Sequence, residues 1–280
     1  MITNIEKIPH EQICDHAKDK FIAIYNQKFG EGGETFFEQQ KTFFLNQMLN
    51  GSYKNKLRLA SSLSILDAFM FLAIEGLSLE PGAGAYCYLM CDTFQDKATQ
   101  TWIQMAKISV TGYGEIFRRQ REGQIKYCDK PVIVYDCDEF SIGEHEGHKF
   151  VNWAKSFPTP PTARIVAAYM KIVRPDGSPD YAVIDMNEIN RLENFSRRFL
   201  GGSTSNALYH SNNGQIDPGF LIAKLCKHAF KTYPKIAIGM GAILEADVDS
   251  HTQPNHEEPG VFGEQPIQGV TVETEENDPF

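Results

Sequence analysis

The chain has 280 residues, which is long enough to bury the core of one large domain or of two small ones. It contains no run of about 20 apolar residues and no basic start followed by an apolar stretch, so we expect a cytoplasmic protein without a membrane partner or signal peptide. The net charge is -9, but residues 245–280 hold ten acidic residues and no lysine or arginine. The remainder has 27 basic and 26 acidic residues, so nucleic acid is not excluded as a ligand.

Two apolar helices are predicted in the first third of the chain. Residues 34–50 place phenylalanine and methionine side chains at helical spacing, and Gly51 ends the pattern. A second helix begins near Ser62 or Ser64, either of which can cap it, and ends at Gly76. Because this second helix is apolar nearly all round, we expect it to be buried.

Hairpins and further helices follow. Residues 86–90 and 101–106 predict two strands joined by a long polar loop, before a helix over residues 112–120 and a strand at 132–135. The turn sequence Arg-Pro-Asp-Gly-Ser-Pro predicts a second hairpin. Its strands, and the two later helices capped by Asp185 and Asp217, are expected at residues 165–173, 181–184, 187–195 and 219–232. The pattern predicts an α+β fold of helices packed on antiparallel hairpins.

Two segments of low regularity interrupt this pattern. Residues 196–215 are rich in glycine, serine and asparagine and predict a flexible loop. Residues 245–280 combine prolines and acidic side chains with few large apolar groups, so we expect a disordered acidic tail. We therefore expect one domain followed by this tail.

The first group of residues that could bind a ligand is a basic helix that begins near Gly112 and Gly114. Small glycines let a phosphate approach the backbone, and free amides at a helix start favour an anion. Its cations, with one lysine just before it, are Lys107, Arg118, Arg119 and Arg121. Glu115 can also pair with an arginine one turn later, which would make an ordinary solvated face.

The second such group lies late in the chain, where acidic residues are scarce. Lys224, Lys227 and Lys231 are spaced to share one helix face, and Arg197 and Arg198 precede them. Like charges at this spacing destabilise a helix unless a counter-charge neutralises them. A polyanion is one such partner, and an acidic surface of the same chain is another.

Three other groups suggest metal chemistry only weakly. In Glu-His-Glu-Gly-His, residues 144–148, the histidines are three apart, whereas a zinc protease helix needs four, so we expect a polar surface turn. Cys87 and Cys91 lie in a segment whose residues alternate like those of a strand, so we expect both to be small core residues. The six cysteines are dispersed along the chain, which favours free thiols. The carboxylates of Asp136, Asp138 and Glu139 could hold Mg²⁺ or simply mark a strand end.

Taken in order, the segments resemble the RecT family of phage and prophage single-strand annealing recombination proteins. The resemblance spans roughly residues 55–240. The motifs that carry it are Gly76-Leu-Ser-Leu-Glu-Pro-Gly82, Lys107 to Gly114 running into Arg121-Glu-Gly-Gln-Ile125, Tyr135-x-x-Asp138-x-Phe140, Asp185-Met-Asn-Glu-Ile189, and Ala223-Lys224 through Phe230-Lys231 to Pro234. Tyr113 stands where the family usually has a basic residue.

This resemblance implies a protein that binds and anneals single-stranded DNA without ATP, and no phosphate-binding loop for a nucleotide is visible. It implies no classical enzyme activity and no required cofactor, with Mg²⁺ as an optional ion. The implied partners are single-stranded DNA, the annealed duplex intermediate, other copies of the chain in a ring or filament, a RecE-like exonuclease, and host SSB or SSB-binding proteins. Passive binding without annealing is the alternative, followed by a metal-dependent nuclease.

The resemblance also implies a division of the chain: an oligomerising helical region at 1–54, a DNA-binding core at 55–244 and the tail at 245–280. The expected groove residues are Lys107, Tyr113, Arg118, Arg119, Arg121, Arg197, Arg198, Lys224, Lys227 and Lys231. The last residues, including Asp278, Pro279 and Phe280, resemble the acidic tip of bacterial SSB, which docks partner proteins. A bare solvated tail is the alternative.

Overall fold

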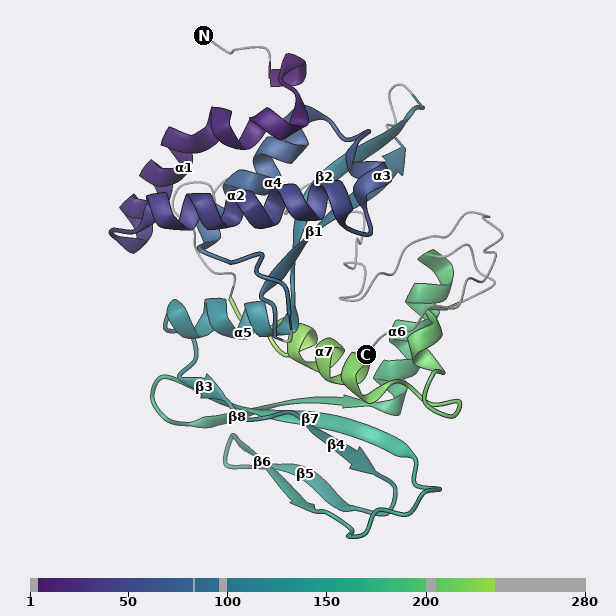
Figure 1. Ribbon diagram of the computed structural model, residues 1–280. Coiled ribbons are helices and arrows are strands. Elements are labelled where there is room, and N and C mark those ends of the chain that lie inside the picture. The colour runs from purple at the N-terminus through teal and green to yellow at the C-terminus, as the bar shows by residue number, and fades with distance from the viewer. Residues whose placement is uncertain (1–4, 83, 96–99, 200–204, 235–280) are drawn as a thin grey trace.

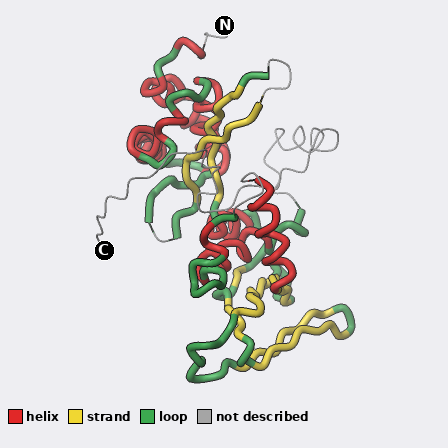
Figure 2. Tube along the Cα trace, turned by 90° about the vertical axis from the view of Figure 1, so that its right-hand side faces the viewer, coloured by secondary structure: helices red, strands yellow, loops and turns green. Residues whose placement is uncertain are grey.

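The computed structural model describes residues 5–234 except 83, 96–99 and 200–204. Its elements form two lobes, which lie one above the other in Figure 1 and are seen from the side in Figure 2. Each lobe has its own cluster of buried apolar side chains. We call residues 5–110 the N-terminal lobe and residues 125–234 the C-terminal lobe. The predicted tail lies outside the described residues.

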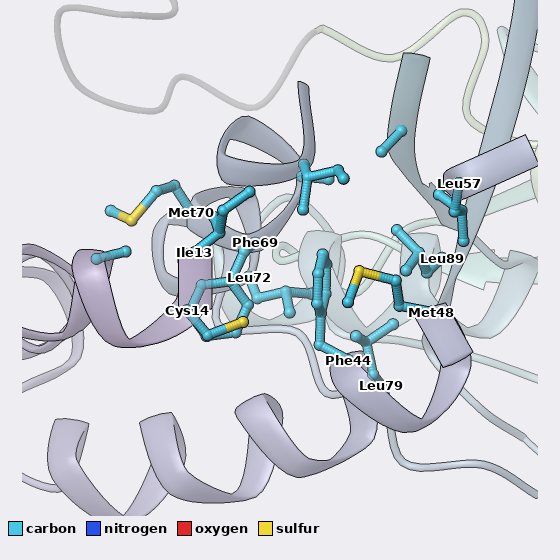
Figure 3. Packing of buried hydrophobic residues seen from close by; sticks show 14 of the residues in the cluster. Ile13, Cys14, Phe44, Met48, Leu57, Phe69, Met70, Leu72, Leu79 and Leu89 are labelled. Carbon is cyan, nitrogen blue, oxygen red and sulfur yellow. The ribbon is translucent and has the colours of Figure 1, made fainter. Parts of the chain in front are cut away.

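The N-terminal lobe packs three long helices against one antiparallel hairpin. The helices are α1 (Ile13–Phe29), α2 (Gly33–Asn50) and α4 (Ser62–Glu75), with the short α3 (Lys54–Leu57) and the 3-10 turns η1 (Ile5–Lys7) and η2 (His10–Gln12) beside them. The rings of Phe21, Phe37 and Phe44 surround Phe69 of α4 at centroid distances of 4.8–5.8 Å. Figure 3 shows how Met48 and Leu89 extend this core toward the hairpin.

The ends of α4 show why the helix begins and ends where it does. Ser61, and not Ser62 or Ser64 as predicted, is the N-cap: its Oγ accepts a hydrogen bond from the Ser64 backbone N at 3.1 Å. Gly76 ends the helix in the left-handed conformation, with a φ of 56°. Since α4 is buried on most sides, the prediction of a buried helix is confirmed.

The hairpin is longer than the sequence pattern indicates. Strand β1 (Cys87–Gln95) pairs with β2 (Trp102–Val110) in a register that runs from Cys87 opposite Val110 to Gln95 opposite Trp102. The polar residues 92–95, predicted as loop, therefore belong to a strand. Backbone pairing extended the strand past the point where its side chains stop being apolar.

In the C-terminal lobe a four-stranded antiparallel sheet is built around one long central strand. Strand β7 (Ile165–Val173) pairs with β8 (Pro179–Asp185) along one edge, and with β3 (Tyr127–Cys128) and β4 (Val132–Tyr135) along the other. Helices α6 (Met186–Phe199) and α7 (Pro218–His228) pack on this sheet, with the 3-10 turn η3 (Ala207–Tyr209) between them. Asp185 and Asp217 accept the capping hydrogen bonds as predicted.

Three expectations for this lobe need correction. A further hairpin, β5 (Glu139–His145) with β6 (His148–Ala154), was not predicted, because its residues are mostly polar and exposed. Residues 196–199 continue α6, so only part of the expected loop 196–215 is irregular. Helix α7 ends at His228, four residues before the predicted end.

The two lobes meet at α5 (Gly112–Arg121), which lies between them in Figure 1. Its neighbouring side chains divide their contacts: Phe117 packs against the N-terminal core and Ile116 against the C-terminal core. The predicted boundary at residues 54 and 55 falls inside α3, within the N-terminal lobe. No helix of the described residues has both the length and the apolarity needed to cross a membrane.

Candidate nucleic-acid interface

The glycines at the start of α5 serve close packing. Thr111 caps the helix by accepting a hydrogen bond from the Gly114 backbone N at 3.1 Å. A Cβ on Gly112 would lie 2.6 Å from the Cβ of Cys226 in α7, and one on Gly114 would overlap the Tyr86 carbonyl oxygen. The space that the sequence suggested for a phosphate is filled by protein. Tyr113, between them, is half exposed.

Arg118 of α5 forms a buried ion pair with the last residue of α4. Its Nε lies 2.7 Å from Oε2 of Glu75, its second terminal nitrogen donates to Oε1 at 3.0 Å, and the Glu75 side chain is 1% exposed. Glu115 adds a second carboxylate at 3.1 Å. Burial raises the pKa of Glu75, and the charge of Arg118 opposes that rise. The pair ties α5 to the N-terminal lobe.

The next arginine, Arg119, binds the opposite lobe. Its guanidinium donates to the Pro234 carbonyl oxygen at 3.1 Å and lies over the ring of Phe230, 4.9 Å from the ring centroid. The residue is 8% exposed, and burial lowers the pKa of its side chain. Arg119 therefore holds the segment after α7 against α5.

Arg121, like Arg118, contacts the N-terminal lobe. Its guanidinium lies 4.7 Å from the centroid of the Phe29 ring and reaches the Gly76 carbonyl oxygen at 3.5 Å. Together with Arg118 and Arg119, it uses most of its hydrogen-bonding and stacking capacity inside the protein. The three predicted groove arginines of α5 thus link the lobes, and their contact with DNA stays a prediction.

The late lysines do not share one exposed helix face. Lys224 is 5% exposed and its Nζ lies 4.9 Å from the centroid of the Phe220 ring, whereas Lys231 lies beyond the end of α7 and is exposed. Lys227 is half-buried. Burial, reinforced by the nearby lysines, lowers the pKa of His228 to about 3. The interpretation of one helix face with three ammonium groups is therefore wrong.

The remaining predicted cations differ in their partners. Lys107 pairs with Asp92 across the β1–β2 hairpin. Arg197 in α6 pairs with Glu193 at 2.8 Å, and the same carboxylate accepts from Nε2 of His210 at 2.9 Å and raises the pKa of that histidine. Arg198 follows in the same helix.

The structure reveals a second basic surface that sequence reasoning missed. Lys54 and Arg58 are exposed and Lys56 is half-buried, all in or next to α3. None of the three makes an ion pair with a residue that the structure describes. The run Lys-Asn-Lys-Leu-Arg at 54–58 is the signal that could have found them.

Exposed apolar side chains lie beside these cations. A parallel bridge between Ala60 and Gln104 holds the segment after α3 against β2, next to the hairpin in Figure 1. Leu59 is 73% exposed and Trp102 is 66% exposed, with Phe94 at 40% on β1. Trp102 is adjacent to Ile103, the partner of Phe94, so Trp102 and Phe94 lie on opposite faces of the hairpin. We call Lys54, Lys56, Arg58, Leu59 and Trp102 the α3–hairpin surface. Cations beside exposed aromatic rings suit single-stranded nucleic acid, because phosphates and bases can bind at once.

The groups that suggested metal chemistry have structural roles. Asp138 accepts hydrogen bonds from the backbone N of Tyr135 and Ser156 and from the Trp153 indole, and Asp136 accepts from the Arg164 backbone N. Residues 144–148 include the turn between β5 and β6, as expected of a polar surface turn. Within the described residues no three histidine, cysteine or acidic side chains are grouped to hold a metal ion.

The buried cysteines of β1 fit a core. Burial raises the pKa of Cys87 to about 12 and that of Cys91 to about 11, so both are neutral thiols at pH 7. The prediction that they are core residues is confirmed by exposures of 1% and 3%.

Comparison with known proteins places the chain in a family. The RecT family model matches residues 44–247, from within α2 to beyond the described end of the C-terminal lobe. The chain belongs to the RecT family. RecT proteins are phage-type single-strand annealing recombination proteins that bind single-stranded DNA and self-associate. No curated protein matches the chain.

Proposed function

We propose that this RecT protein anneals complementary DNA strands without ATP, as an oligomer that holds single-stranded DNA by its phosphates. Annealing requires base edges to stay free for Watson–Crick pairing, so the protein should grip the backbone and stack on bases without reading their edges. Lysine and arginine side chains that lack a protein partner meet the first need, and exposed rings meet the second.

The observation that carries the proposal is the α3–hairpin surface on a chain of this family. Its three cations face no described carboxylate at ion-pair distance. Leu59 and Trp102 keep large apolar areas in water beside them. Exposed apolar patches often mark binding sites, and cations without an internal partner can bind phosphates at no cost in broken ion pairs. We therefore propose that DNA contacts this surface as well as the exposed late cations, while α5 fixes the geometry between the lobes.

The partner proteins belong to the same proposal. A RecE-like exonuclease would supply the single strand, and the acidic end of the chain at Asp278, Pro279 and Phe280 would dock host SSB-binding proteins. The support for the second idea is sequence likeness to the SSB tip, since these residues lie outside the described part of the chain. Replacing Phe280 by Ala should abolish capture of a host partner if the likeness is functional, and unchanged capture would contradict it.

An annealing assay with purified full-length protein tests the proposed function. Two complementary oligonucleotides, one carrying a fluorophore and the other a quencher, are mixed with no nucleotide present. We expect the protein to accelerate pairing, with binding that weakens steeply as salt rises because bound cations release DNA counterions. Protection of DNA without faster pairing would favour a passive binder. Shortening of the labelled strand that requires Mg²⁺ would favour the nuclease.

A further inference from the structure

The α3–hairpin surface carries an excess of positive charge, and the end of the chain carries an excess of negative charge. Lys54, Lys56 and Arg58 carry three positive charges without an ion-pair partner among the described residues. Residues 245–280 carry ten negative charges and no lysine or arginine. Such opposite excesses on one chain attract, and the attraction is strongest at low ionic strength.

One segment of the tail matches the α3–hairpin surface in both charge and apolarity. Residues 257–264 read Glu-Glu-Pro-Gly-Val-Phe-Gly-Glu, with two apolar side chains, Val261 and Phe262, between acidic ones. The α3–hairpin surface likewise sets exposed apolar groups beside cations. Burying one valine and one phenylalanine there would remove apolar area from water on both sides.

The exposed apolar side chains at the end of the hairpin are divided between its two faces. Side chains alternate between the faces of a strand, and Phe94 of β1 is paired with Ile103 of β2, so the two share a face. Met105 lies two residues further on the same face and is 38% exposed. Trp102 lies on the opposite face, which it shares with Leu89, and Leu89 packs in one cluster with Leu57 of α3. Leu59 and Trp102 are therefore the exposed apolar side chains that an extended segment such as 257–264 could cover beside the cations.

The tail is long enough to reach the α3–hairpin surface. The described chain ends at Pro234, whose carbonyl oxygen is held by Arg119 at the junction of the lobes. Between Pro234 and Glu257 the chain can extend to roughly 75 Å, at about 3.3 Å per residue. That reach exceeds the diameter of a compact protein of this size, which is on the order of 50 Å.

We propose that residues 257–264 occupy the α3–hairpin surface of the same chain when DNA is absent, and that single-stranded DNA displaces them. The acidic tail then acts as an internal competitor that limits binding to weak or chance polyanions. This inference rests on the proposed function, because it assigns DNA to the same surface. It names the tail of the same molecule as the occupant in the resting state.

Photo-crosslinking in the full-length protein tests the docking directly. Benzoylphenylalanine replaces Phe262, and the irradiated monomer band is analysed by mass spectrometry. We expect crosslinks to the region of Leu59 or Trp102, lost when oligothymidylate is added and reduced at least severalfold by Lys54→Gln/Lys56→Gln/Arg58→Gln. Crosslinks confined to other regions, or found only between chains, would overturn the proposal.

Charge-neutral tail variants test the competition. Glu257→Gln/Glu258→Gln/Glu264→Gln should raise the affinity for oligothymidylate severalfold at low salt, and this gain should vanish when the three cations near α3 are also replaced. A matched control, Glu273→Gln/Glu275→Gln/Glu276→Gln, removes the same charge outside the segment and should give a smaller gain. Equal gains would mean general charge repulsion and would overturn the specific docking.

The two proposals fail in different ways. If docking crosslinks form but the protein does not accelerate annealing, the proposed function is wrong and the docking stands. If annealing is fast but neither crosslinks nor the affinity gain appear, the docking is wrong and the proposed function stands.

Discussion

Helix α5 and the segment around α3 are both short and basic, but their cations differ in whether they have partners within the protein. The arginines of α5 are buried or half-buried and bind Glu75, the Pro234 carbonyl oxygen and aromatic rings. The cations at 54–58 face no described carboxylate at ion-pair distance. The first set therefore stabilises the arrangement of the lobes, and the second set is available to a ligand.

This difference shows that a count of basic residues does not locate a binding surface. A guanidinium has five donors and a planar face, so it can satisfy carbonyls, carboxylates and rings from two lobes at once. An arginine in a helix between two cores is for that reason suited to linking the two lobes. Lysines in a short helix at the surface have fewer ways to pair, and their charge stays available.

Replacing Arg118 with Ala should have the largest effect, because it leaves Glu75 buried without its cation. Removing one partner of a buried ion pair costs about 3–5 kcal/mol of stability. Urea denaturation followed by circular dichroism measures the free energy of unfolding. Lys54→Ala is the control, with an expected change within about 0.5 kcal/mol because the site is exposed. Equal losses in the two variants would remove the distinction between α5 and α3.

The pH dependence of stability should show that α7 also has buried basic groups. Burial, with Lys231, Lys224 and Arg191 nearby and Glu188 opposing, lowers the pKa of His228 to about 3. The unfolded state takes up a proton below about pH 6.5 while the folded state does not, so stability falls as pH drops from 6.5 toward 3. The slope contributed by this group is at most about 1.4 kcal/mol per pH unit.

His228→Gln removes that contribution and should flatten the curve between pH 6 and pH 4. The measurement is the urea midpoint at several pH values, compared between the variant and the unaltered chain. A curve that keeps its full slope in the variant would show that other groups, such as the carboxylates, control the acid response. The exposed His145→Gln serves as a control, since 82% of its side chain is in water.

Neutralising Lys54, Lys56 and Arg58 together should weaken DNA binding about tenfold or more at moderate salt, with little change in stability. Each lost phosphate contact on single-stranded DNA lowers the salt slope by about 0.7, so three contacts lower it by about 2. Fluorescence anisotropy at several salt concentrations gives both numbers. An unchanged slope would mean that this surface does not contact phosphates.

The smallest effect is expected for the late lysines taken singly. Lys231→Ala should lower the salt slope by about 0.7 or less and leave stability unchanged, because the side chain is exposed. Lys224→Ala should instead lower stability, because the stem of that lysine is buried against Phe220. If Lys224→Ala weakened DNA binding more than Lys231→Ala at equal stability, the late helix would rank with α3 as a DNA surface.

Much of the fold could be predicted because its signals are local. Apolar spacing and a terminal glycine marked α2 and α4, and the acidic caps Asp185 and Asp217 marked the starts of α6 and α7. The strands at 132–135 and 165–173 matched their predicted bounds. The β5–β6 hairpin was not predicted, because most of its side chains face water. Its links to the sheet include the rings of Phe140 and Trp153, which lie near Tyr169, and Lys149, which pairs with Asp180.

The α+β class, the order of the main elements and the membership of the RecT family can all be inferred without the structure. Each of these depends on residue pattern along the chain. Which charges are available to a ligand depends on the folded arrangement: Glu75 lies 43 residues from Arg118, and Pro234 lies 115 residues from Arg119. An ion pair or hydrogen bond between such distant residues forms only when the chain folds, so the same arginine can be a ligand contact or an internal link.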